Sequence, residues 1–160
     1  MSELRELYQQ VILDHNKDPR NFGKIEHANR TQEGYNPLCG DHLHVYLHVV
    51  TCEGNTIIRD ISFEGSGCAI SKASASLMTE ILKGRTRSEA TEVFERFHKL
   101  VTVDNEEEID LENIGKLAVF TGVREFPMRV KCATLAWHAM NSALSKEELD
   151  HDENDTITTE

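Results

Sequence analysis

The sequence has few prolines, few aromatic residues and no long apolar run. Three prolines, 6% aromatic residues, 39% apolar and 28% charged residues indicate a globular chain. No apolar stretch approaches the roughly 20 residues that a membrane-spanning helix needs. The start, MSELRELYQQVILDH, is charged from its third residue and has no small-residue cleavage site. We therefore expect no signal peptide, no membrane span and a cytoplasmic location.

The sequence also lacks an excess of basic residues. With 17 basic and 28 acidic residues, its formal net charge is −11. Such a surface repels phosphate backbones and anionic lipids, so we expect neither nucleic acid nor membrane as a partner. Part of the excess is local, in 104-DNEEE-108 and the last 14 residues. A partner protein with a basic cleft is compatible with this charge.

The length of 160 residues predicts a single domain. We place that domain at residues 1–146 and interpret 147–160 as an acidic flexible tail. An apolar stripe predicts a helix over 3–15, which Asp18-Pro19 ends. It comprises Leu4, Leu7, Tyr8, Val11 and Ile12. Residues 18–40 indicate a long irregular connection. Alternation predicts a strand over 42–51, joined by the turn Glu53-Gly54-Asn55 to a second strand over 56–64.

Helical patterns dominate the second half. A helix is expected to start near Cys68 and to end at Lys83-Gly84. Thr86 and Glu89 have capping-box spacing and predict the start of another helix. A short helix is expected over 110–120, and a last helix from about Arg129. The order of elements favours an α+β fold, a small antiparallel sheet packed on one face by helices.

The cysteines are not spaced as in a zinc finger, since no Cys-x-x-Cys occurs. In the cytoplasm, the four cysteines are more often metal ligands or reactive thiols than disulfides. Taken singly, each is more commonly an inert buried side chain, and Cys52 fits that interpretation well.

Three cysteines have a more informative local context. Cys39 and Asp41 lie two apart in a turn-rich loop, so in extended chain they project to the same side. Cys68 and Cys132 are expected at helix N-termini, where the helix dipole favours the thiolate. Three thiolates and one carboxylate suffice for tetrahedral zinc. The residues alone therefore indicate a zinc or thiolate site without deciding between them.

The histidines indicate a polar sheet face rather than a metal site. His42, His44 and His48 alternate on one face of the first predicted strand, with no acid or cysteine alternating among them. His42 adjoins Asp41 and is an alternative ligand. His138 follows Cys132 at the wrong interval to share its helix face.

At these residues the sequence resembles the NifU/IscU/SufU family of iron–sulfur assembly proteins, and its SufU branch in particular. The resemblance spans most of residues 7–144 and rests on four stretches: 7-LYQQVILDHNKDPRNFG-23, 36-NPLCGD-41, 63-FEGSGCAISKASAS-76 and 126-FPMRVKCATLAWHA-139. It implies a SufE/NifU-like fold and metal ligands at Cys39, Asp41, Cys68 and Cys132.

Two departures separate this chain from the IscU type. Phe126-Pro127-Met128-Arg129-Val130 stands where IscU has Leu-Pro-Pro-Val-Lys, and Lys131 replaces the histidine before the last cysteine. Residues 98–121 resemble the insertion of the SufU branch. These departures favour a zinc-dependent sulfurtransferase over an IscU-like scaffold.

The resemblance implies that the chain accepts persulfide sulfur from a SufS-type cysteine desulfurase and passes it to a downstream iron–sulfur assembly scaffold. Cys39 is our expected acceptor, because its loop can move, with Asp41 orienting the zinc site. Arg129 and Lys131 are expected to steer the persulfide or the partner. Two alternatives stay open: a scaffold that holds a [2Fe–2S] cluster, and a zinc-stabilised adaptor that activates the desulfurase by docking.

Overall fold

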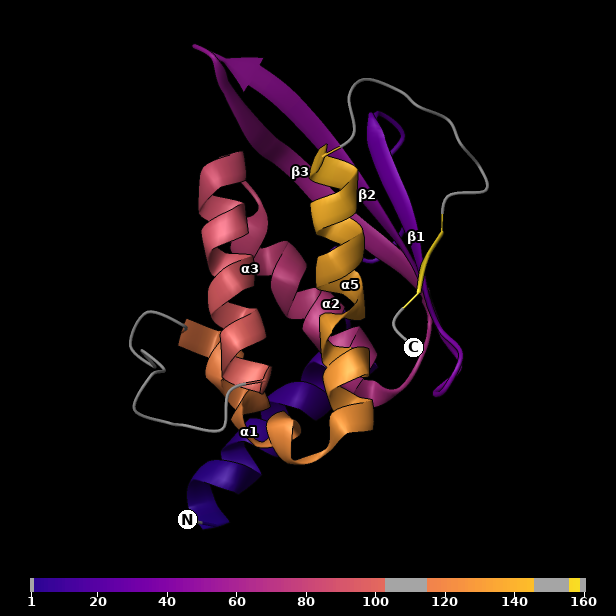
Figure 1. Ribbon diagram of the computed structural model, residues 1–160, viewed down its shortest axis with the longest axis vertical. Coiled ribbons are helices and arrows are strands. Elements are labelled where there is room, and N and C mark those ends of the chain that lie inside the picture. Colours follow the sequence, from indigo (N-terminus) through magenta and orange to yellow (C-terminus); the bar gives the residue numbers. More distant parts are fainter. Residues whose placement is uncertain (1, 103–114, 146–155, 159–160) are drawn as a thin grey trace.

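The structure is a computed structural model that describes residues 2–102, 115–145 and 156–158. Its elements, in chain order, are α1 (Ser2–Lys17), β1 (Arg30–Asn36), β2 (Asp41–Cys52), β3 (Asn55–Ser66), α2 (Ala69–Leu82), α3 (Arg87–Thr102), the 3₁₀ helix η2 (Gly115–Glu125), α5 (Pro127–Ser145) and β4 (Thr156–Thr158). The predicted α+β class and the sheet with helices on one face are confirmed (Figure 1).

The sheet has the strand order β3-β2-β1-β4. β2 pairs antiparallel with both β1 and β3, whereas β4 runs parallel to β1. The expected hairpin is present, with Cys52 paired to Asn55. Glu53 (φ 51°) and Gly54 (φ 83°) form its turn, and positive φ at both positions matches the twist of the strands.

β1 corrects the expectation that residues 18–40 are irregular throughout. Its buried face consists of Gln32, Gly34 and Asn36, so it carries no apolar alternation to reveal a strand. α5 covers this face closely, since a Cβ on Gly34 would lie 3.0 Å from Leu135 Cδ1. Ser142 Oγ of α5 donates a 3.0 Å hydrogen bond to Gln32 Oε1. Tertiary contacts therefore define this strand.

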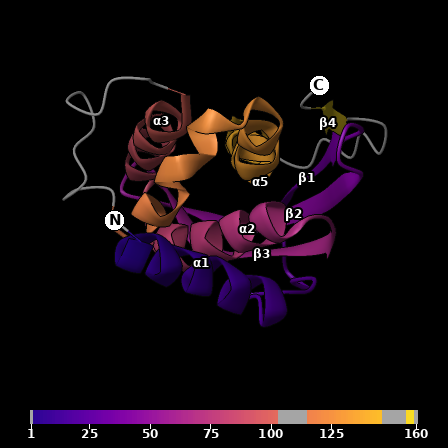
Figure 2. The same cartoon turned by 90° about the horizontal axis from the view of Figure 1, so that it is seen from below.

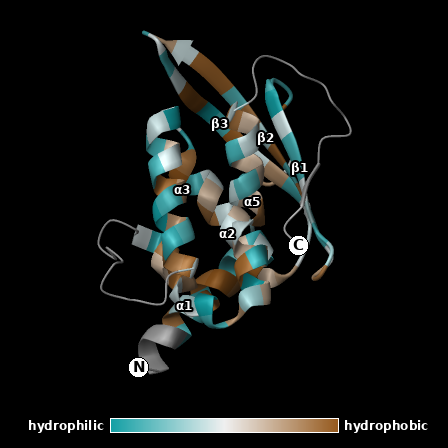
Figure 3. Ribbon diagram, in the orientation of Figure 1, coloured by the Kyte–Doolittle hydropathy of each residue, from teal (hydrophilic) through white to brown (hydrophobic). Residues whose placement is uncertain are grey.

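The helices form a layer over the sheet. α5 lies against β1 and β2, and α2 lies against β3. Figure 2 shows α1 alongside α2, with α3 and α5 beyond α2. In Figure 3, apolar residues follow the strands β2 and β3, whereas much of α3 is hydrophilic. Trp137 is fully buried at the centre, where it stacks on Phe97 at 4.9 Å between ring centroids.

The helix ends follow local sequence. Thr86 and Glu89 form the predicted capping box, with reciprocal hydrogen bonds of 3.1 and 3.2 Å. α1 ends at Lys17, directly before Asp18-Pro19. α5, however, begins at Pro127, because proline is well suited to the first turn of a helix. Cys132 consequently lies in the second turn, and its predicted place in the first turn is wrong.

Three further expectations concern the apolar stripe of α1, the short helix and the tail. We expect Leu7 on the buried stripe of the first helix, but it is 54% exposed. Among the described side chains of that stripe, only Tyr8, Val11 and Ile12 pack against the core. The short helix expected over 110–120 is a 3₁₀ helix over 115–125, and 110–114 lie outside the described residues. The predicted tail is described only at 156–158, which form β4.

Candidate metal centre

Three segments that are distant in sequence converge at one end of β2. Cys39 lies in the turn between β1 and β2, Asp41 is the first residue of β2, and Cys132 lies in α5. One sulfur or carboxylate oxygen from each lies within 4.8 Å of those of the others. Asp41 and Cys132 are buried, whereas Cys39 is exposed. The site thus has a fixed interior and an accessible thiol.

Asp41 is a fully buried carboxylate whose charge is compensated by hydrogen bonds. The backbone N–H of Cys68 donates to its Oδ1 at 2.8 Å. Asn36 Nδ2 donates to its Oδ2 at 3.4 Å. Gly67 packs so closely that a Cβ there would lie 2.7 Å from Oδ1. These contacts hold the carboxylate beside the sulfurs and offset the cost of burying it in the core.

Asn36 joins the turn to the helix. Its Oδ1 accepts from the backbone N–H of Leu38 at 3.3 Å, which shapes the turn that presents Cys39. Its Nδ2 also donates to Cys132 Sγ at 3.5 Å. Asn36 is the first residue of the stretch 36-NPLCGD-41, and this match to a family motif is the signal that points to it. Its side-chain chemistry alone does not predict a role in the site.

Cys68 borders this cluster as the N-cap of α2. Its sulfur accepts from the backbone N–H of Ser71 at 3.4 Å, so the expected position at a helix start is correct. A hydrogen bond from the Cys132 thiol is the main cause that lowers the pKa of Cys68, to about 7. Its sulfur is therefore readily ionised and borders the cluster, but it is not among the three ligand atoms that lie within 4.8 Å of one another.

The pKa of Cys132 is shifted in the opposite direction, upwards. The hydrogen bond that it gives to Cys68 raises its pKa most, followed by burial and by its contacts with Asp41 and Cys39. Without a cation, the buried cluster therefore keeps a proton on Cys132. A dication would displace that proton, as thiolate-bound metals do. Three sulfurs and one carboxylate fit zinc in number and in chemistry.

The remaining predicted site residues lie outside the cluster. Arg129 is exposed, with its guanidinium carbon 5.0 Å from the Phe126 ring centre. Lys131 is half-buried next to Cys132. Cys52 is exposed at the hairpin, at the opposite end of β2 from Asp41. That Cys52 takes no part in the site stays a prediction.

The histidine face of β2 is partly covered rather than fully solvated. His42 is exposed, and its ring forms a hydrogen bond with the carboxylate of Glu33. His44 stacks on Tyr46 at 4.8 Å between ring centroids, and burial lowers the pKa of His44. Tyr46 itself is buried and bonds to Glu64. His42 is thus engaged on the outer face and does not belong to the sulfur cluster.

The fold and this site define a small α+β domain with a cysteine- and aspartate-lined centre at the end of its sheet. Residues 7–146 match the family described as NifU-like N terminal domain, and the chain belongs to that family. No helix among the described residues is long and apolar enough to cross a membrane.

Several relatives share most of this chain. It is 38% identical over 147 residues to "Zinc-dependent sulfurtransferase SufU" of Bacillus subtilis, which covers 92% of this chain and 95% of the relative. It is 34% identical to "Iron-sulfur cluster assembly scaffold protein IscU" of Streptococcus pyogenes, with 91% and 87% coverage. A crystal structure of a putative SUF-system scaffold protein from Fervidobacterium islandicum is similar at a TM-score of 0.74 and 34% identity, covering 88% of this chain and 98% of that one.

Proposed function

We propose that this protein is a zinc-dependent sulfur acceptor for iron–sulfur cluster assembly. It would receive persulfide sulfur from a SufS-type cysteine desulfurase and pass it to a downstream assembly scaffold. The observation that carries the proposal is the exposed Cys39 beside the buried Asp41 and Cys132. The similarity to a zinc-dependent sulfurtransferase supports the same function.

The proposed ligands are Cys39, Asp41, Cys68 and Cys132. Zinc, when bound, would keep the thiolates deprotonated and hold three distant segments together. Three thiolates and one carboxylate carry four negative charges, which a dication only half neutralises. The two N–H groups that already bond to Asp41 and Cys68 offset part of the remainder. A carboxylate among the ligands makes the set easier to open than four thiolates.

Cys39 is the proposed sulfur acceptor, because it alone of the four is exposed and lies in a turn. Gly40, at φ 72°, and Pro37 shape that turn, whereas Cys68 and Cys132 belong to helices. The Cys39 thiolate attacks the outer sulfur of the partner's persulfide. The partner's S–S bond breaks, its cysteine leaves as a thiolate, and Cys39 carries the new persulfide.

The surface around the centre supports docking of a partner protein. Four apolar side chains in the segments that carry the site are 41–54% exposed: Tyr35, Leu38, Phe126 and Met128. Large apolar side chains that stay exposed in the segments bearing a reactive group suit an interaction site. Arg129 and Lys131 lie in the same region of α5 and are proposed to attract the anionic persulfide.

A scaffold that holds a [2Fe–2S] cluster on the same ligands is the second candidate. It is favoured by the similarity to relatives named as IscU scaffolds in Streptococcus pyogenes and Thermotoga maritima. Lys131, rather than a histidine, precedes the last cysteine, which removes one ligand of the IscU type. Reconstitution with iron and sulfide under anaerobic conditions tests this candidate by the absorbance of a cluster.

Sulfur transfer is tested with radiolabelled cysteine and a SufS-type desulfurase. We expect label on this chain that thiol reductants remove, and a trapped persulfide that mass spectrometry maps to Cys39. Cys39→Ser should abolish the label, and Cys52→Ser, the matched control, should retain it. A desulfurase that is activated without any label on this chain would support the adaptor alternative and contradict the proposal.

A further inference from the structure

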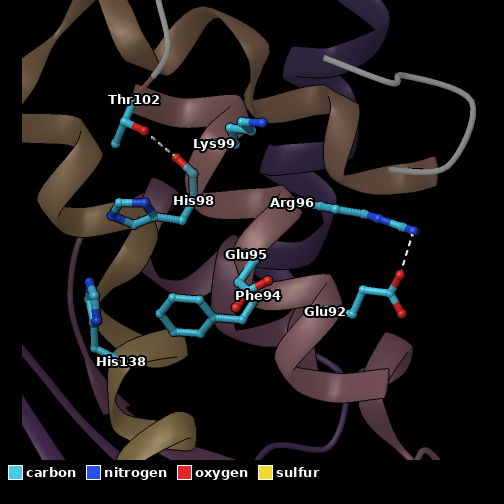
Figure 4. A pocket seen from close by; sticks show the side chains of 8 residues that line it. All are labelled: Glu92, Phe94, Glu95, Arg96, His98, Lys99, Thr102 and His138. Atoms are coloured by element: carbon cyan, nitrogen blue, oxygen red, sulfur yellow. Dashed lines mark hydrogen bonds and ion pairs between the residues drawn. The ribbon is translucent and has the colours of Figure 1, made fainter. Parts of the chain in front are cut away.

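A cavity of about 580 Å³ opens between α3 and α5, apart from the cysteine centre. Phe94, Glu95 and His98 of α3 and His138 of α5 contribute to its lining. Figure 4 shows the two imidazoles turned towards one another, with the Phe94 ring beside them. The cavity therefore presents two metal-ligating side chains on two different helices.

The ring positions suit a shared ligand. The centroids of His98 and His138 lie 6.0 Å apart, with their planes at 77°. The Phe94 ring packs edge-on against His138 at 5.2 Å and holds that imidazole in place. With metal–nitrogen bonds of about 2.0–2.1 Å, two imidazoles that share an ion have ring centres about 5 Å apart at a tetrahedral angle and about 6.4 Å apart when they are opposed. The observed 6.0 Å lies between these limits, so a small rotation of one ring brings the pair to a shared ion.

The ring nitrogens of this pair are available. His15 bonds through its ring to Ser76, and His48 bonds to the carbonyl of His27. No residue in the described part of the chain hydrogen-bonds to a ring nitrogen of His98 or His138. Burial, and secondarily the nearby His98, lower the pKa of His138. Its imidazole is thus neutral near pH 7 and keeps a lone pair for coordination.

We propose that His98 and His138 form a second metal site, for a borderline divalent ion such as Zn²⁺, Co²⁺ or Ni²⁺. Imidazole is a good ligand for these ions. The charged side chains that line the cavity are balanced, with Glu92 and Glu95 against Arg96 and Lys99. Water completes the coordination, because among the described residues no carboxylate or third imidazole is grouped with this pair. With two protein nitrogens, this site binds more weakly than the four-ligand centre and fills after it. The proposal does not depend on the function of the cysteine centre.

The other close histidine pair lacks these properties. His27 and His48 have ring centroids 4.7 Å apart. His48 Nδ1 is engaged by the His27 carbonyl at 2.9 Å, and His27 Nε2 lies 4.0 Å from Asp60. His27 is well exposed, which makes His27→Gln a matched control for a surface histidine in a stacked pair.

Cobalt titration of the full-length, zinc-loaded protein tests the proposal. We expect a further equivalent of Co²⁺ to bind with ligand-field absorption but without the near-ultraviolet charge transfer of thiolate ligands. His98→Ala and His138→Gln should weaken this binding at least about tenfold, since even the hydrogen-bond partners of metal ligands cost about 10–100-fold. His27→Gln should bind as the wild type does, and zinc in the cysteine centre should be unchanged in all variants.

Three results would contradict the proposed metal site at His98 and His138. They are no binding of Co²⁺ beyond the zinc-filled centre, wild-type affinity in His98→Ala, or loss of binding in His27→Gln. His98 is exposed on α3, so its substitution tests the site even if the half-buried His138 proves necessary for folding.

Discussion

The backbone N–H of Cys68 donates a 2.8 Å hydrogen bond to Oδ1 of Asp41. This bond joins the N-cap of α2 to the start of β2, and it places Cys68 beside the buried carboxylate. One proposed ligand is therefore oriented by the backbone of another. The two cannot move independently, which makes Asp41 structurally as well as chemically important.

Removing the Asp41 carboxylate should cost stability and metal together. Asp41→Ala leaves the partly buried Cys68 N–H unpaired, and we expect a loss of about 1–3 kcal/mol in the unfolding free energy of the metal-free protein. Asp41→Asn keeps an acceptor oxygen and should lose less, yet it also weakens zinc because the anionic ligand is gone. Urea unfolding and metal analysis measure the two effects. Wild-type zinc affinity in Asp41→Asn would rule out the carboxylate as a ligand.

Gly67→Ala should damage the centre through sterics alone. Its Cβ would lie 2.7 Å from Asp41 Oδ1, closer than real Cβ atoms approach, so the carboxylate must shift. We expect lower zinc affinity and a lower melting temperature. Gly122→Ala is the control, because a Cβ there meets nothing within 4 Å. Equal zinc binding in both variants would show that the position of Asp41 does not matter to the metal.

The purified protein should retain one zinc per chain after gel filtration, because the proposed ligands form a single four-coordinate set. Cys39→Ser, Cys68→Ser and Cys132→Ser should each lose or weaken it. Cys52→Ser should not, since Cys52 lies at the far end of β2. Elemental analysis provides the measurement. Normal zinc in Cys68→Ser, or loss in Cys52→Ser, would contradict the ligand assignment.

Chelation should destabilise the whole domain. Binding to the folded state alone contributes about 2.7 kcal/mol when free ligand is a hundredfold above its Kd, which is about 5–10 °C in melting temperature for a domain of this size. A thermal melt with and without chelator measures the shift. Cys68→Ser, if it holds no zinc, should show no shift. An unchanged midpoint in the wild type would mean that metal and fold are not coupled.

Stability should fall as the pH falls through about 6.5. His15 is buried and its ring bonds to Ser76, and burial is the main cause that lowers its pKa below 6.5. The unfolded chain then takes up a proton before the folded chain does, so the stabilisation is present above about pH 6.5 and is lost below it. Urea unfolding between pH 5 and 8 measures the slope. His15→Gln should be less stable at pH 8 but should show a smaller slope, and an unchanged slope would exclude His15 as the cause.

Elements with a strong local signal were predicted well. The hairpin of β2 and β3, the capping box at Thr86 and the end of α1 before Asp18-Pro19 all lie where the sequence placed them. Their determinants are apolar alternation, side-chain capping and the steric effect of proline, which act over a few residues. The start of α5 was missed by two residues, because Pro127 was not recognised as its first residue.

The candidate site, too, was predicted from the sequence only in part. The motifs identified Cys39, Asp41, Cys68 and Cys132 as proposed ligands, and the structure brings Cys39, Asp41 and Cys132 within 4.8 Å of one another. Cys68 borders this set, and the neighbouring Cys132 thiol lowers its pKa. That all four bind zinc, and that Cys39 accepts sulfur, stay predictions. Asn36 was not anticipated, because a polar residue at the end of a strand carries no pattern that reveals a hydrogen bond to Cys132, which is far away in sequence.

By itself, the sequence determined the periodic elements, the fold class and the residues able to bind a metal, since these depend on spacing and side-chain chemistry. Only the tertiary structure decided that 30–36 is a strand, because Gln32, Gly34 and Asn36 are buried by α5 rather than by their own hydrophobicity. Likewise, only packing decided that Cys39 is exposed while Cys132 is buried, and that His98 and His138 face one cavity. Proximity between residues far apart in sequence depends on how helices and strands pack, which no local pattern encodes.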